Sequence, residues 1–223
     1  MNIVNSNMDE ISKSILKSST SLVGIACKDG IVLGADRRST AGTIVMKKDE
    51  EKIYKINDYI AASYTGVVSD IQLTGKVLAA ELRLKELKTK TRPSIKEAAN
   101  LLAMLVYKNI RTPSMVPSII GTLIAGVNDE GNTELYTIDP SGSVVKVKDY
   151  DANFSSGMPF ILGLLEREWK KDMSVQQGVE LAVEAIKSST QRDTASGNGI
   201  DVFTITKDGI NHVISQEITP MYK

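Results

Sequence analysis

The spacing of apolar residues alternates along the chain: it is strand-like, then helical, then strand-like, then helical, and strand-like again at the end. Short apolar segments bounded by turn residues predict strands, and Asp29-Gly30 and Asp208-Gly209 have the composition of hairpin turns. We expect strands at 22–28, 31–36, 43–46, 52–56, 59–66, 118–127, 133–139 and 143–150, and a last hairpin over 201–215. Residues 1–19 are rich in Asn, Ser and Lys and predict little regular structure.

Helical spacing occurs in two pairs of segments between these strands. Serine followed three residues later by Gln or Glu is typical of a capping box, and it occurs at Ser69, Ser94 and Ser174. The expected helices are 69–88, 94–109, 159–169 and one that begins at 174. Groups of strands separated by helix pairs indicate an α+β fold. We therefore predict a four-layer αββα sandwich, two antiparallel sheets flanked by helix pairs, formed by one domain over residues 20–223.

Composition narrows the possible functions. The 27 basic residues balance the 27 acidic ones, which disfavours a nucleic-acid partner. No apolar run approaches the ~20 residues of a membrane span, and the N-terminus does not have the pattern of a secretory signal, so we expect a cytoplasmic protein.

With one cysteine and one histidine, Cys27 and His212, we expect no metal site and no cofactor. His212 is more simply a half-exposed strand residue than a catalytic base, so a hydrolase would need another proton acceptor.

Three polar groups of residues stand beside the predicted strands: Asp36-Arg37-Arg38, Lys52, and the segment QRDTASGNGID at 191–201. Each alone is explained by a solvent-exposed strand end or loop. Combined with Thr20-Ser21-Leu22-Val23-Gly24-Ile25, Gly34-Ala35, Ser39-Thr40, Gly66 and Ser156-Gly157, they resemble the β-type subunits of the 20S proteasome, most closely the archaeal and actinobacterial ones, over residues 20–215. That family consists of threonine-type N-terminal-nucleophile (Ntn) hydrolases and has an αββα sandwich.

The resemblance implies an active site built on Thr20, exposed as a new N-terminus when a leader of residues 1–19 is removed. The freed α-amino group, with a pKa of about 7.7–8.0, can accept the hydroxyl proton without histidine. Lys52 would either lower the cost of the alkoxide or shuttle the proton, and Asp36 would pair with it. The remaining implied site residues are Asp193, Ser196 and Ser156 around the amine, Arg38 in the supporting network, and Gly66 as oxyanion N–H donor. Tyr64, Val68, Glu50 and Tyr54 would line the pocket for the side chain before the cleaved bond, with Tyr64 making it shallow.

One residue departs from the family pattern. Ser19 stands where glycine usually precedes the threonine, and a residue with a Cβ reaches the required backbone turn less easily. The first hypothesis is therefore a threonine endopeptidase that hydrolyses unfolded proteins with broad specificity, conditional on cleavage between Ser19 and Thr20. The alternatives are an unprocessed structural subunit of a mixed ring and a stand-alone hydrolase of small amides. The resemblance implies a heptameric β ring, α-subunit rings and an ATP-dependent unfoldase as partners.

Overall fold

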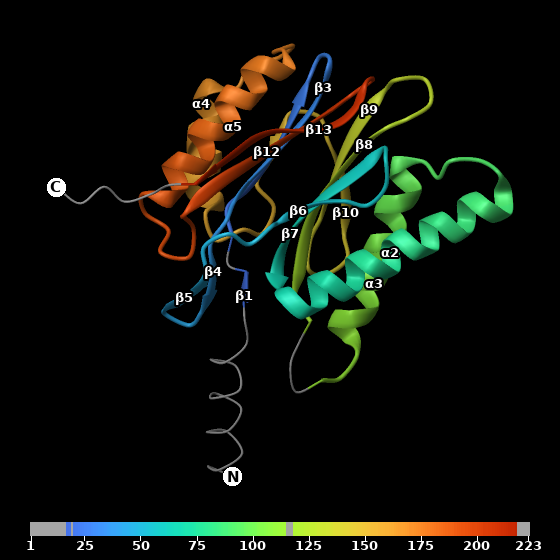
Figure 1. Cartoon of the computed structure of the whole chain (residues 1–223), viewed down its shortest axis with the longest axis horizontal. Coiled ribbons are helices and arrows are strands. Elements are labelled where there is room, and N and C mark those ends of the chain that lie inside the picture. Colours follow the sequence, from blue (N-terminus) through green and yellow to red (C-terminus); the bar gives the residue numbers. More distant parts are fainter. Residues whose placement is uncertain (1–16, 19, 115–117, 218–223) are drawn as a thin grey trace, which may run out of the picture.

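The computed structural model describes residues 17–18, 20–114 and 118–217, and in them two antiparallel sheets face each other between helices (Figure 1). The helices α2 (Val68–Thr89) and α3 (Ile95–Arg111) cover one outer face, and α4 (Met158–Glu168) and α5 (Val175–Thr190) cover the other. The predicted αββα sandwich is confirmed. None of the helices in these residues is both long and apolar enough to cross a bilayer.

The two sheets are named here sheet A and sheet B. Sheet A runs in the order β10 (Val144–Val147), β9 (Thr133–Ile138), β8 (Ile120–Val127), β7 (Ile60–Val67), β1 (Lys17–Ser18), β4 (Ser39–Ala41) and β5 (Ile44–Lys47), with β6 (Ile53–Lys55) also paired to β7. Sheet B runs β11 (Tyr150–Asp151), β2 (Leu22–Cys27), β3 (Gly30–Asp36), β12 (Gly199–Thr206) and β13 (Gly209–Glu217).

The central strand β3 explains why this fold has continuous rather than alternating apolar segments. All seven of its residues are buried. Ile31 and Leu33 belong to the core between the two sheets, whereas Val32 packs into the core beneath α4 and α5. A strand covered on both faces needs apolar side chains in both directions, so the period-two alternation disappears.

Two of the three predicted capping boxes are confirmed and the third is wrong. Ser94 and Ser174 each accept from the backbone N–H three residues on, and Glu97 and Gln177 return the bond. The helix α2 instead begins at Val68, directly after β7, and its cap residue makes no side-chain hydrogen bond. Ser69 therefore lies inside the first turn, because the chain passes from strand to helix with no connecting residue.

The predicted strand 143–150 is two strands in different sheets. Its first part is β10 of sheet A and its last residues belong to β11 of sheet B. Between them Asp149 holds the crossing: its carboxylate accepts from the Tyr150 N–H at 2.8 Å, and its carbonyl accepts from the Ala26 N–H at 2.7 Å. This crossing delivers the chain after residue 151 to the neighbourhood of Thr20.

The segment before Thr20 is the other departure. Lys17 pairs with Thr40 of β4 and with Val67 of β7, and Ser18 pairs with Gly66. The prediction of little regular structure over 1–19 is thus wrong for these two residues, which join β4 and β5 to the rest of sheet A. Residues 1–16 and Ser19 lie outside the described residues.

Candidate active site

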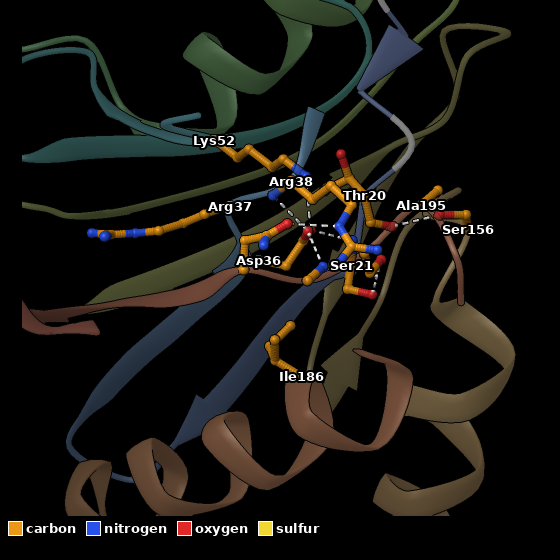
Figure 2. A network of polar contacts seen from close by, with 12 residues as sticks. Thr20, Ser21, Asp36, Arg37, Arg38, Lys52, Ser156, Ile186 and Ala195 are labelled. Carbon is orange, nitrogen blue, oxygen red and sulfur yellow. Dashed lines mark hydrogen bonds and ion pairs between the residues drawn. The ribbon is translucent and has the colours of Figure 1, made fainter. Parts of the chain in front are cut away.

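Thr20 is fully buried, and its carbonyl is held from the side of the α4 helix (Figure 2). The Gly157 N–H donates to Thr20 O at 3.3 Å. Ser156 Oγ lies 3.1 Å from the same oxygen and 2.6 Å from Asp193 Oδ2, so its single hydrogen is shared between the two acceptors. The turn before α4 and the segment after α5 therefore both converge on Thr20.

Asp36, the last residue of β3, accepts hydrogen bonds from four segments of the chain that meet at the site. Its Oδ1 accepts from the Ser21 N–H at 2.8 Å and from Lys52 Nζ at 2.7 Å. Its Oδ2 accepts from the backbone N–H groups of Arg38 at 3.0 Å and Gly197 at 2.9 Å. A carboxylate with four donors and no exposed surface is held in one orientation, and so is the lysine paired with it.

Burial makes Lys52 chemically different from a surface lysine. Only 2% of the residue is exposed. Burial lowers its pKa below the usual value, and the neighbouring Asp36 carboxylate opposes that shift without cancelling it. A lysine whose charged form is disfavoured can give up and regain a proton more readily, which is a property of catalytic groups.

A chain of hydroxyl groups connects Ser21 to Asp193. Ser21 Oγ donates to Ser189 Oγ at 2.6 Å and lies 2.7 Å from Ser196 Oγ, which in turn lies 2.6 Å from Asp193 Oδ2. Sequence reasoning missed Ser21 and Ser189 as site residues. A signal existed for Ser189, because this serine falls on the apolar face of α5 with Ala182 and Ile186.

Arg38 and Arg37 are adjacent in sequence but point in different directions (Figure 2). Arg38 Nε donates to Asn198 Oδ1 and Nη1 to the Thr194 carbonyl, both at 2.8 Å, and so fixes the loop after α5. Gly197 has a φ of +152°, which residues with a Cβ rarely adopt, and a Cβ there would also lie 2.4 Å from Arg38 Nη2, so glycine is favoured at this position.

Arg37 belongs to a separate cluster away from Thr20. It forms a two-point contact with Asp201 at 2.5 and 2.8 Å. His212 Nε2 lies 2.9 Å from the same carboxylate, and its ring stacks on Phe203 with centroids 4.2 Å apart. The side chain of His212 is 37% exposed on β13, which confirms the prediction of a half-exposed strand residue.

Gly66 lies near the end of β7, opposite Ser18 of β1, two residues before Thr20. Its φ is +133°, and a Cβ there would lie 2.0 Å from the Ile119 carbonyl oxygen. Both the backbone conformation and the close approach of Ile119, the residue before β8, require glycine at this position.

The four residues expected to line a substrate pocket come from β6, β7, the first residue of α2 and the segment before β6. Tyr64 is 1% exposed and packs edge-on against Tyr54, with ring centroids 5.8 Å apart. Tyr54 lines a cavity of about 230 Å³ against α2, whose other lining residues are Lys55, Ile56, Ile71, Gln72, Gly75, Lys76 and Ala79. The Glu50 N–H donates to the Arg37 carbonyl at 2.9 Å. Val68 is the first residue of α2.

The layers of the sandwich and the buried polar network at the end of β3 place the chain in the class of Ntn-hydrolase folds. Comparison with known proteins gives the family. The family described as "Proteasome: Proteasome subunit" matches residues 16–205, and the chain belongs to it.

Several archaeal proteins named proteasome subunit beta are similar to the chain over nearly its full length. The protein of Nanoarchaeum equitans is 40% identical over 191 residues, covering 86% of this chain and 95% of its own. That of Methanothermobacter thermautotrophicus is 38% identical over 205 residues (92% and 94%), and that of Methanocaldococcus vulcanius 36% over 202 residues (91% and 88%). The chain is thus a proteasome-type protease subunit of the β kind, and its family implies assembly into a proteasome core with other subunits.

Proposed function

We propose that the chain is a threonine endopeptidase whose nucleophile is the Thr20 hydroxyl, freed by removal of residues 1–19. The observation that carries the proposal is the buried Lys52–Asp36 ion pair, with Nζ and Oδ1 2.7 Å apart. The same carboxylate oxygen accepts from the N–H of Ser21, the residue directly after Thr20. A buried ammonium–carboxylate pair is often no more stable than an apolar pair of similar volume, so stability alone gives little reason to keep it at this position.

The proposed reaction is acyl transfer. The Thr20 Oγ attacks the peptide carbonyl, its proton passes to the freed α-amino group, and the C–N bond breaks as the leaving amine takes a proton. The resulting ester is then hydrolysed by water. Lys52 stabilises the alkoxide charge or relays the proton, and the Gly66 N–H is the proposed donor to the oxyanion. Asp193, Ser196 and Ser156 hold the amine, and Arg38 holds the loop that carries two of them.

The position of β1 supports the idea that the end of the leader lies where an extended substrate would pair with β4 and β7. Lys17 and Ser18 add a strand between β4 and β7 and end beside Gly66. An extended peptide can add to two strands in the same way through main-chain hydrogen bonds, which impose little sequence preference. Such binding suits unfolded protein substrates, and Tyr54, Glu50, Tyr64 and Val68 are the residues proposed to receive the side chain before the cleaved bond.

The wider assembly is also proposed rather than established. We infer a heptameric β ring between α-subunit rings in the cytoplasm, fed by an ATP-dependent unfoldase. The second candidate function is a structural subunit that retains its leader, favoured by Ser19 before Thr20.

The test is a Thr20→Ala variant in the assembled particle. We expect hydrolysis of a fluorogenic peptide to fall by at least about 10³-fold while assembly is unchanged, with Thr89→Ala, an exposed hydroxyl at the end of α2, as the matched control. Unchanged hydrolysis by Thr20→Ala would refute the nucleophile. An inactive wild-type particle that retains residues 1–19 would favour the structural subunit.

A further inference from the structure

A buried asparagine bridges the two sheets beside the candidate active site. Asn153 follows β11 of sheet B and is 3% exposed. Its Nδ2 reaches sheet A, where it lies 3.0 Å from Thr122 O, 2.8 Å from Thr137 Oγ1 and 3.0 Å from Ile138 O. Its Oδ1 accepts from the Phe154 N–H at 2.7 Å. Three acceptors on one side and a donor on the other fix the orientation of the amide.

The sheet A end of this bridge is close in register to Gly66. Thr122 and Ile138 form the pair at which the β8–β9 ladder ends. Thr122 is also paired with Tyr64 of β7, two residues before Gly66. Asn153 therefore binds the same end of sheet A that carries the proposed oxyanion donor.

The other end of the bridge leads to Thr20. Ser156 and Gly157, three and four residues after Asn153, make the two contacts with the Thr20 carbonyl. Ser155 stabilises the turn between Asn153 and Ser156, because its hydroxyl donates to the Ala152 carbonyl at 2.7 Å. A shift of Asn153 would be passed along this short turn to Thr20.

Two local features fit an asparagine at this position. Its φ is +48°, a left-handed conformation that asparagine adopts more readily than other residues with a Cβ. In addition, Gly121 leaves the space for its carbonyl: a Cβ at 121 would lie 2.0 Å from Asn153 Oδ1.

We propose that Asn153 is a positioning residue that holds the Ser155–Gly157 turn, and with it Thr20, in register with the strand carrying Gly66. The proposal rests on the proposed function, since it concerns the geometry between the nucleophile and the oxyanion donor. Displacing reacting groups by 1 Å can cost on the order of 10²-fold in rate, even when the altered residue does not touch substrate. The hydrogen bonds of Asn153 described above reach neither Thr20 nor Gly66.

The test compares Asn153→Gly with Asn128→Gly in the assembled particle. Glycine keeps the positive φ accessible and removes only the side-chain bridge. Asn128 lies at the opposite end of the β8–β9 hairpin, where its Oδ1 accepts from two loop N–H groups, so it is a matched structural asparagine. We expect Asn153→Gly to lower kcat about 10- to 100-fold with KM within about threefold, and Asn128→Gly to leave kcat unchanged. Asn153→Asp should resemble Asn153→Gly, because a carboxylate has no N–H to donate.

Hydrogen exchange separates this proposal from the proposed function. Amides 154–157 should exchange at least about tenfold faster in Asn153→Gly and at the wild-type rate in Asn128→Gly, whether or not the wild-type particle is active. A wild-type particle without hydrolysis would overturn the proposed function and leave exchange to decide the role of Asn153. Unchanged exchange at 154–157, or an unchanged kcat in an active particle, would overturn the positioning role.

Discussion

Replacing Lys52 with methionine tests the central ion pair of the site. Methionine keeps much of the side-chain volume and removes the charge, which leaves the Asp36 carboxylate buried with its three backbone donors at Ser21, Arg38 and Gly197. Removing one partner of a buried pair costs about 3–5 kcal/mol, and the three remaining N–H groups place the expected loss of unfolding free energy near the lower end, about 3 kcal/mol.

The matched control is Lys47→Met. Lys47 also forms an ion pair, with Glu50 at 3.2 Å, but its side chain is 52% exposed. Solvent screening limits such a pair to below about 1 kcal/mol. The contrast between the two variants therefore isolates burial, since the lost charge and the new residue are the same.

Equilibrium urea unfolding of the full-length chain measures both variants, followed by the fluorescence of its single tryptophan, Trp169. The double variant Asp36→Asn/Lys52→Met should cost less than the sum of its single variants, because it removes both charges. In the assembled particle Lys52→Met should also lower kcat by about 10²–10⁴-fold. A loss of stability no greater than for Lys47→Met would refute the buried pair, and an unchanged kcat would refute its role in proton transfer.

Three further predictions test other parts of the account. The Tyr64 hydroxyl is buried with no partner among the described residues, so Tyr64→Phe should raise the unfolding free energy by about 1–2 kcal/mol in urea unfolding, and a decrease would contradict this. The hydrogen bond from Lys85, together with those from Ser94, lowers the pKa of Glu97, so its stabilisation is present above the unfolded-state pKa and is lost as the pH falls through the folded-state pKa. Glu97→Gln should therefore lower stability by a few tenths of a kcal/mol at pH 7, with the gap closing in thermal unfolding as the pH falls through the lowered pKa of Glu97; a gap independent of pH would argue against it. Ser19→Gly should speed removal of residues 1–19, followed by intact mass over time, and slower removal would count against the backbone argument.

Much of the fold could be predicted because its signals are local. The capping boxes at Ser94 and Ser174 need only the next three residues, and the buried strands are visible as apolar runs. The strands that were missed, β1 and β4, are two and three residues long and exist only through pairing with distant segments. The strand predicted over 143–150 shows the same limit, because its alternation continues through the point where the chain changes sheets.

The candidate site divides along similar lines. Thr20, Asp36 and Lys52 could be proposed from the sequence because the family resemblance marks each of them. Ser189 could have been found as a serine on an apolar helix face. Asn153 could not, since its significance lies in three acceptors on strands 15 to 31 residues away in the chain.

The most direct test of the account is the intact mass of the chain taken from an assembled particle that hydrolyses peptides. We predict the mass of residues 20–223, with Thr20 as the N-terminal residue carrying a free amine. A chain that still carries residues 1–19 in such a particle would contradict it, because the Thr20 nitrogen would then be an amide and could not accept the proton of its own hydroxyl.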